Sequence, residues 1–273
     1  MECGDVRDRP GLMYGATAAP FDLVPSKLLP PLVRPGTIRR PLLDRLADGD
    51  PRRIISGVAP PGYGKTTLLA QWAEHGGPAF AWVAVDERDN DAKVLLSYVA
   101  QALDAVQPLG RRVFDALASR ASSVPGSVVP RLSAAFASMT VPVALVLDDV
   151  HLLRNRECRD ALSVLAEHVP AGSRLVLAGR AEPPLRIARL RAEGKITEIS
   201  AQDLSLTAVE AASLLRAAEV ALGADEVAEL HQRTEGWPAG LFLAALYVRE
   251  GGALGTAAVS FGGDDLAGGA GPG

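Results

Sequence analysis

The chain has 273 residues, of which 48% are hydrophobic and 22% charged, and this balance excludes a mostly disordered protein. Its net charge of -4 provides no global basic field for nucleic acid. The two cysteines, Cys3 and Cys158, share no motif spacing, which argues against a disulfide framework or a zinc site. No signal-peptide segment opens the sequence, and no uncharged apolar run reaches about 18 residues. We therefore expect a cytoplasmic protein without membrane binding.

The N-terminal part is predicted to have little regular structure. Residues 1–25 form a disordered arm in this interpretation, because the first 20 are polar and rich in glycine and proline. Prolines between positions 20 and 35 forbid regular helix and predict an extended segment over the core. Residues 39–46 then predict a short helix with leucines on one face. A packing role with solvated arginines suffices for it, and the alternative places it, with Arg39, beside a nucleotide base.

Residues 53–69 carry the functional argument. Ile54, Ile55 and Val58 predict a short buried strand, and a loop rich in proline and glycine follows. An apolar helix then begins at Gly64-Lys65-Thr66. A strand, a glycine-containing loop and a helix start are the setting that a phosphate-binding P-loop requires. The alternative, a chance Gly-Lys-Thr turn, is disfavoured by the strand before it and the helix after it.

The chemistry of this loop follows from its residue types. Inward-pointing loop amides and the helix N-terminus favour a polyphosphate. Lys65 would reach the β- and γ-phosphates, and the Thr66 hydroxyl would ligate Mg²⁺. Ala59 stands where the motif has its first glycine, which is a mild substitution. The nucleotide-binding set predicted for the loop is Ala59, Gly62, Tyr63, Gly64, Lys65, Thr66 and Thr67.

The next segments alternate between strands and helices. Residues 80–85 predict a second buried strand. The acidic run 86–91 could hold a metal, but we favour a capping role for the helix predicted over residues 92–105. Residues 111–139 predict two helices around a break at 123–126.

A second functional element ends at Asp148 and Asp149. The apolar run before them predicts a central parallel strand that delivers both carboxylates to its C-terminal edge, where ligands bind in such sheets. This resembles a Walker B strand. Asp148 would hold Mg²⁺ through water, and Asp149 would polarise an attacking water. His151 is interpreted as a cap or packing residue rather than a catalytic one.

Two further strands complete the predicted sheet. Residues 173–180 end at Arg180, which we interpret as a nucleotide sensor rather than a solvated loop arginine, because charged groups act at strand ends. Residues 196–199 predict a fifth short strand. Strands that alternate with helices predict an α/β fold with a doubly wound parallel sheet. We assign residues 26–200 to this nucleotide-binding domain.

Residues 201–250 are predicted to form a small helical lid domain. Thr207 and Glu210 form a capping box that opens a helix through residue 218, and Gly223 lies just beyond its end. Residues 225–233 predict a second helix, and Pro238 suits the first turn of a third. Residues 251–273 form a Gly-rich tail of low complexity, for which we expect disorder.

Together these segments resemble the nucleotide-binding region of STAND-class P-loop ATPases. The resemblance is strongest to large LuxR-type transcriptional regulators related to the bacterial maltose activator. Its motifs are Ser26-Lys-Leu-Leu-Pro30, Arg39-x-x-Leu-Leu-x-x-Leu46, Ala59-Pro-Pro-Gly-Tyr-Gly-Lys-Thr-Thr-Leu68, Trp82-x-x-x-Asp86, Leu145-Val-Leu-Asp-Asp-Val-His151, Gly179-Arg180, Leu190-Arg191 and Thr234-Glu-Gly-Trp-Pro-Ala-Gly240. The P-loop alone is generic, whereas its combination with Gly-Trp-Pro is specific.

The resemblance implies a regulatory ATPase that rests with ADP and is active with ATP and Mg²⁺. It also implies that Arg180 senses the γ-phosphate, that Pro238 presses on the adenine ring, and that Arg39 flanks the base. Catalytic roles fall to Asp149, Lys65 and Arg180, with slow hydrolysis at most, because the sequence shows no separate arginine finger.

Family members continue through a winged helix, a helical-repeat sensor and a DNA-binding helix-turn-helix, whereas this sequence ends after the predicted lid. We therefore expect a truncated module without direct DNA binding, with self-association or pairing with related regulators as its protein contacts. Arg111, Arg112 and residues 186–191 are interpreted as solvated faces rather than a recognition helix. The alternatives are an AAA-type working ATPase and a non-catalytic remnant that acts only through partners.

Overall fold

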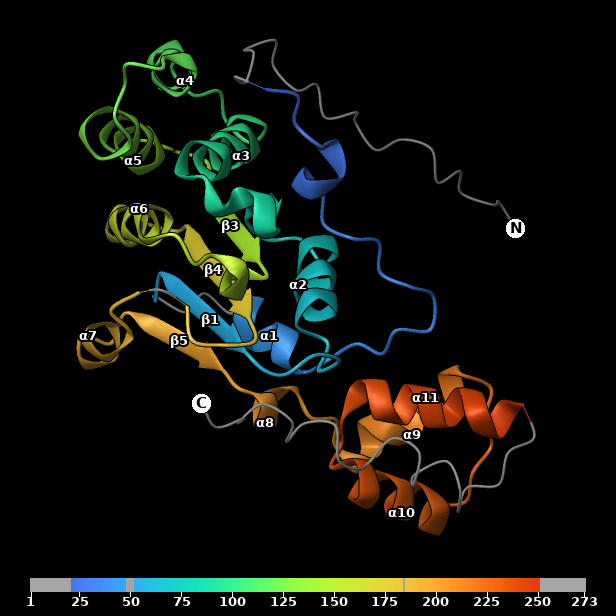
Figure 1. Ribbon diagram of the computed structural model, residues 1–273. Coiled ribbons are helices and arrows are strands. Elements are labelled where there is room, and N and C mark those ends of the chain that lie inside the picture. Colours follow the sequence, from blue (N-terminus) through green and yellow to red (C-terminus); the bar gives the residue numbers. More distant parts are fainter. Residues whose placement is uncertain (1–20, 48–51, 184, 251–273) are drawn as a thin grey trace, which may run out of the picture.

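The computed structural model describes residues 21–47, 52–183 and 185–250, and it shows an α/β domain followed by a group of packed helices (Figure 1). The disorder expected for residues 1–25 and 251–273 lies outside these described residues, except at residues 21–25, where Phe21 and Leu23 pack against the core. Residues 21–41 run as a strap from the α/β domain towards the helical group (Figure 1). The strap contains one 3₁₀ turn, η1 (Pro25–Leu28), and is otherwise free of regular helix until α1, as its prolines predict.

The sheet has five parallel strands in the order β2-β3-β4-β1-β5, which confirms the predicted α/β fold. Its strands are β1 (Ile54–Val58), β2 (Ala79–Ala84), β3 (Val143–Asp148), β4 (Arg174–Gly179) and β5 (Ile196–Ile199). The register pairs Val58 with Gly179 and Ala84 with Asp148, so these strands end at a common edge. Because β4 lies between β1 and β3, the segments after these three strands are neighbours in space.

Both faces of the sheet are covered. Along β3, Leu145 and Leu147 pack in the cluster that contains α3 to α6, whereas Ala144 and Val146 pack in the cluster that contains α1 and α2. Alternate side chains of a strand point to opposite faces, so the continuous apolar run of β3 fits a strand that is buried on both sides. The helices of the α/β domain are α1 (Leu42–Ala47), α2 (Lys65–Glu74), α3 (Ala92–Asp104), α4 (Arg111–Ala118), α5 (Val129–Ala137), α6 (Arg156–Glu167), α7 (Ile187–Ala192) and α8 (Ala201–Leu204).

Three details differ from the sequence prediction. Helix α1 begins at Leu42 rather than at residue 39, because the residue before Pro41 is disfavoured in helical conformation. The segment 123–126 is not a break: Ser123 caps a π-helical turn, η3 (Val124–Val128), that leads directly into α5. The structure also adds α6 and α7, which the sequence analysis did not predict.

The acidic run after β2 acts as predicted. Asp91 accepts hydrogen bonds from the backbone N–H groups of Lys93 and Val94 and so caps α3. Asp86 caps the short turn η2 (Glu87–Asn90). Among the described residues, no group of three His, Cys, Asp or Glu side chains is arranged to hold a metal ion.

The lid consists of α9 (Ala208–Ala217), α10 (Ala224–Thr234) and α11 (Pro238–Arg249), which share a separate small core (Figure 1). The predicted capping box forms, because Thr207 and Glu210 exchange hydrogen bonds at the start of α9. Gly223 has a different place from the one predicted: it precedes α10 as its N-cap, and α9 ends earlier, at Ala217.

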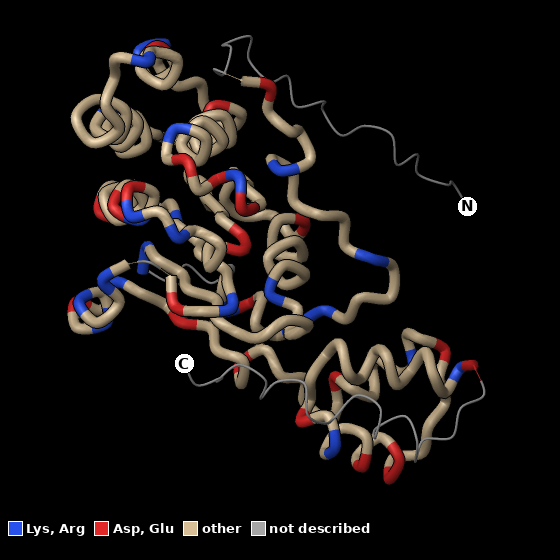
Figure 2. Tube along the Cα trace, in the orientation of Figure 1, with Lys and Arg blue, Asp and Glu red and all other residues tan. Residues whose placement is uncertain are grey.

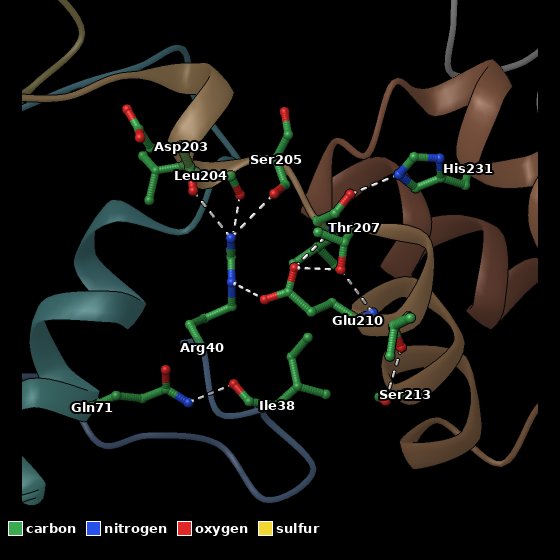
Figure 3. Close-up of polar contacts among 12 residues, drawn as sticks. Ile38, Arg40, Gln71, Asp203, Leu204, Ser205, Thr207, Glu210, Ser213 and His231 are labelled. Atoms are coloured by element: carbon green, nitrogen blue, oxygen red, sulfur yellow. Dashed lines mark hydrogen bonds and ion pairs between the residues drawn. The ribbon is translucent and has the colours of Figure 1, made fainter. Parts of the chain in front are cut away.

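The strap is attached at both ends. At one end, the Lys27 ammonium lies 2.5 Å from Oδ2 of Asp89, whose side chain is fully buried, and 3.3 Å from Oδ2 of Asp86. At the other end, the buried Arg40 guanidinium donates to Glu210 of α9 and to carbonyls at the end of α8 and directly after it (Figure 3). The strap therefore connects the end of β2 to the base of the lid.

Candidate functional site

The candidate site lies where β1, β4 and β3 end side by side. The predicted P-loop joins β1 to α2, and the Ala59 N–H donates to the Gly179 carbonyl at the end of β4. Gly62 and Gly64 both have φ of +79°, a left-handed conformation that favours glycine. Gly64 is the N-cap of α2, so the loop leads straight into the first turn of that helix. The strand, loop and helix that the sequence predicted are all present.

Lys65 lies against the loop. Its Nζ donates to the carbonyl oxygens of Ala59 at 2.7 Å and Pro60 at 3.0 Å. Burial lowers the pKa of Lys65, while the negative charges of Asp148 and Asp149 oppose that shift. The ammonium is therefore held by the loop backbone, where a phosphate group would gain a positively charged partner.

Thr66 and Asp148 meet at the centre of the site. The Thr66 hydroxyl donates to Oδ2 of Asp148 at 2.5 Å, and the Asp149 N–H donates to Oδ1 at 3.0 Å. Burial raises the pKa of Asp148, while the Thr66 hydrogen bond opposes that shift. A hydroxyl and a buried carboxylate are the hard oxygen donors that Mg²⁺ prefers, and a cation would offset the desolvation of Asp148. The two residues predicted to ligate magnesium therefore fit that ion.

Asp149, His151 and Arg180 surround this pair. Asp149 has φ of 60°, and its side chain is 48% exposed, with Oδ1 at 3.6 Å from Nδ1 of His151. Burial lowers the pKa of His151, Asp149 opposes that shift, and the charge of Arg180 adds to it. Arg180 lies directly after β4, at the strand end where it was predicted, its side chain is exposed, and its charge acts on His151. His151 packs against Gly179, where an added Cβ would lie 3.3 Å from the His151 backbone nitrogen.

The lid also contacts the loop. Trp237 precedes α11, and its indole Nε1 donates to the Pro61 carbonyl at 3.1 Å. The Ala239 N–H donates to the Gly62 carbonyl at 3.1 Å. Pro238, which the resemblance places on the adenine ring, lies between these two residues as the first residue of α11. Sequence reasoning noted the Gly-Trp-Pro motif but missed the contact of Trp237 and Ala239 with the P-loop.

The remaining predicted residues lie around the loop. Tyr63 is partly buried and packs against the core cluster of α1 and α2, and Thr67 is exposed in the first turn of α2. Arg39 is exposed and pairs with Asp44. Its neighbour Arg40, which sequence reasoning did not single out, is the buried arginine of this segment. The contacts of Arg39 and Pro238 with a base stay predictions.

Comparison with known proteins shows which proteins the chain resembles. No family model matches it. It is 34% identical over 243 residues to the HTH-type transcriptional regulator MalT of Serratia proteamaculans, and 33% identical over 237 residues to MalT of Klebsiella pneumoniae strain 342. Each alignment covers 84% of this chain. Over this shared region, the MalT regulators are homologues of the chain. It spans about a quarter of their length, 25% and 26% respectively.

Solved structures agree with the fold of this chain. A STAND protein with a tetratricopeptide repeat sensor from Pyrococcus horikoshii has a TM-score of 0.50 at 15% identity, and covers 79% of this chain and 30% of its own. The Walker-type ATPase of Pyrococcus abyssi has a TM-score of 0.52 at 14% identity, and covers 81% of this chain and 70% of its own. At these identities, the two structures show the fold of this chain and nothing further about it.

The distribution of charged and apolar residues in the described chain bears on two other interpretations, a DNA-binding face and a membrane-spanning helix. Basic and acidic residues are interspersed along both domains (Figure 2). Arg111 pairs with Asp115, Arg189 with Glu193, and Arg191 with two glutamates, as solvated faces would. In the part of the chain that the structure describes, no helix has both the length and the apolar character needed to cross a membrane.

Proposed function

We propose that the chain is an ATP/ADP-binding switch module of a bacterial transcriptional regulator, with slow Mg²⁺-dependent hydrolysis at most. The observation that carries this proposal is the convergence of Lys65, Thr66 and Asp148 at the end of the P-loop strand, with the lid in contact with the same loop. MalT-type relatives and the shared P-loop ATPase fold support it.

Each residue has a distinct role in this proposal. Lys65 exchanges its carbonyl partners for the β- and γ-phosphates, which are better acceptors for an ammonium. Thr66 and Asp148 hold Mg²⁺, which supplies charge neutralisation to the phosphate oxygens when it is bound. Asp149 orients the attacking water, and Arg180 senses the γ-phosphate from the end of β4.

The nucleotide base is assigned to the side of the P-loop that faces the lid and the strap. Pro238 would press on the adenine ring from the lid, and Arg39 would flank the base from the strap. Because one nucleotide would then touch the loop, the strap and the lid together, the presence of a γ-phosphate at Arg180 can change how these parts pack. That change is the signal that the module would pass on.

Thermal unfolding with and without nucleotide tests binding. A ligand that binds only the folded state at about 100 times its Kd adds roughly 2.7 kcal/mol of stability. For a domain of this size, that corresponds to a rise in Tm of about 5–10 °C. We expect this rise with Mg-ADP and with Mg-ATP, and its loss in Lys65→Ala. Lys195→Ala is the matched control, because Lys195 is exposed and pairs with Glu193.

Two results would contradict the proposal. An absent rise in wild-type Tm would show that the loop binds no nucleotide, and an undiminished rise in Lys65→Ala would show that the site is elsewhere. Phosphate release in a single-turnover assay tests the second part. Rapid turnover with ring assembly would replace the switch by an AAA-type working ATPase.

A further inference from the structure

The lid holds the P-loop through two consecutive carbonyl groups. Trp237 Nε1 donates to the Pro61 carbonyl, and the Ala239 N–H donates to the Gly62 carbonyl, each at 3.1 Å. These carbonyls belong to the Pro61–Gly62 and Gly62–Tyr63 peptide units. A trans peptide is planar, and its N–H points opposite to its carbonyl. The two lid bonds therefore fix the directions in which the N–H groups of Gly62 and Tyr63 point.

The fit between loop and lid is close. A Cβ added at Gly62 would lie 2.6 Å from Cβ of Ala239 and 2.8 Å from Nε1 of Trp237. On the lid side, a Cβ added at Gly240 would lie 2.6 Å from Cε3 of Trp237. The indole ring thus lies against two glycine backbones, one in the P-loop and one in α11, with no room for a side chain at either.

The lid end of this contact is itself anchored. Gly236, with φ of +71°, lies so close to Leu206 that an added Cβ would be 2.4 Å from the Leu206 carbonyl oxygen. The Leu206 N–H donates to the Gly236 carbonyl at 2.8 Å, and Nε2 of His231 lies 2.7 Å from the Leu206 carbonyl oxygen. Because Leu206 is buried in the lid core, Trp237 is carried by the packed lid rather than by a free loop.

We propose that Trp237 is a positioning residue of the nucleotide site. Its indole N–H, with the Ala239 N–H, turns the Gly62 and Tyr63 amides into an arrangement ready for an anionic phosphate. Conversely, a phosphate that reorients these amides strengthens or weakens the hydrogen bond from Trp237 to the loop, and so changes how firmly the lid is attached. This inference rests on the proposed nucleotide binding and adds the residue that joins the phosphate loop to the lid.

The first test separates positioning from folding. Trp237→Phe keeps an aromatic ring but removes the indole N–H, so we expect about a tenfold weaker affinity for a fluorescent ADP analogue, the range expected for loss of one hydrogen bond. Addition of Mg-ADP should change the tryptophan fluorescence of the wild type. That change should be largely lost in Trp237→Phe, because Trp72 and Trp82 are buried in the α/β core. Phe242→Leu, a change on the partly exposed face of α11, is the control.

The second test needs no nucleotide. Gly62 and Gly64 share φ of +79°, so Gly62→Ala and Gly64→Ala both place an alanine in the left-handed region. Only at Gly62 does the added methyl collide with Trp237, because nothing lies within 4 Å of a Cβ at Gly64. We therefore expect acrylamide to quench tryptophan fluorescence more strongly in Gly62→Ala than in the wild type. In Gly64→Ala, quenching should match the wild type.

The outcomes distinguish this inference from the proposed function. If the wild type binds the ADP analogue and Trp237→Phe binds it equally well with the full fluorescence change, the positioning role is wrong and the nucleotide site stands. If Gly62→Ala and Gly64→Ala are quenched alike, the lid contact is wrong. If the wild type binds no nucleotide, both the proposed function and the positioning role fall.

Discussion

The sheet and the lid differ in how much of their stability can come from a core of their own. Strand β3 is buried along its whole length between helices on both faces, and side chains from α1 to α7 fill the two clusters around the sheet. Among the described residues, the three lid helices and the segments next to them share one cluster of eight buried residues. A core this small leaves the lid dependent on contacts outside itself.

Specific hydrogen bonds are among the contacts that attach the lid to the rest of the described chain. Arg40 fastens the base of the lid to the strap, and Trp237 with Ala239 fastens the start of α11 to the P-loop (Figure 3 shows the Arg40 contacts). In the proposed switch, the sheet would serve as the frame that holds Thr66 and Asp148 in place, and the lid would be the part that responds to the ligand. Elements with a small core of their own open at a lower free-energy cost than a large core does, which fits this division of roles.

The largest expected effect is a loss of stability on truncation of a core leucine, and it should distinguish the core around the sheet from the core of the lid. Leu145 in β3 and Leu241 in α11 are both fully buried, and truncation of either to alanine should cost about 2–5 kcal/mol in its own region. Leu145→Ala should lower the global unfolding midpoint in urea. Leu241→Ala should instead raise amide hydrogen exchange in α9 to α11 and leave the strands protected. Equal loss of protection in the sheet would show that lid and sheet unfold as one unit.

Removal of the strap attachment should have the next largest effect. The Arg40 guanidinium donates to Glu210 at 2.8 Å and to the carbonyls of Leu204 at 2.8 Å, Ser205 at 3.1 Å and Asp203 at 3.3 Å. Arg40→Ala leaves the partly buried Glu210 carboxylate without its cationic partner and leaves three carbonyls without their donor, which should cost about 3 kcal/mol in urea unfolding. Arg40→Lys should not restore it, because an ammonium lacks the planar set of donors.

The neighbouring arginine is the matched control for this prediction. Arg39 pairs with Asp44, and both side chains are more than half exposed. Arg39→Ala should therefore change stability by less than about 1 kcal/mol. Similar losses in both variants would contradict the idea that the buried guanidinium anchors the lid.

Asp148 should matter more for the ligand than for the fold. Because burial raises its pKa, ionised Asp148 weakens the unliganded fold as pH rises from the ordinary value through the raised one. Asp148→Asn removes that penalty but also one acceptor oxygen, so the unliganded Tm should move by only a few degrees. The extra Tm rise that Mg²⁺ gives over ADP alone should vanish. In Asp149→Asn that Mg²⁺-dependent rise should persist, because the Asp149 carboxylate is half exposed and is not paired with Thr66.

The smallest expected effect is a pH dependence of the lid. Burial alone would raise the pKa of Glu210, but the Thr207 N–H and hydroxyl and the Arg40 guanidinium together hold it below its ordinary value of 4.5. A lowered carboxyl pKa contributes stability above pH 4.5 that is lost as pH falls through the folded-state value. Lid exchange rates should therefore rise in acid. The difference between wild type and Glu210→Gln isolates this residue, and a difference that does not vary between pH 6 and pH 3 would contradict it.

Much of the α/β domain was predictable from local patterns. Five strands were placed to within one or two residues, because continuous apolar runs in a buried parallel sheet differ clearly from their polar flanks. The P-loop, the capping of α3 by Asp91 and the Thr207–Glu210 box were also predictable, since each depends on residues close together in sequence. Helix α6 was missed although Asn155 and the buried residues Cys158, Leu162 and Leu165 form its capping and periodic signals.

The pairing of Arg40, rather than Arg39, with the lid was not predictable. Both arginines lie beside Pro41, and nothing in the local pattern distinguishes them. Only the folded chain shows that Arg40 faces Glu210, which is 170 positions away in sequence. In the same way, the Gly-Trp-Pro motif was noted, but its contact with the P-loop joins segments that are 176 positions apart.

The sequence by itself determined the class of fold, the loop that would hold phosphate, and the two carboxylates at the end of β3, because short-range periodicity and motif spacing specify each of them. The tertiary structure decided which of the described charges are buried, namely Lys27, Arg40, Asp89 and Asp148, and how the lid meets the loop. Burial and long-range contact depend on where the crossovers place each strand and helix. That placement comes from the packing of the whole chain and is not encoded in any one segment.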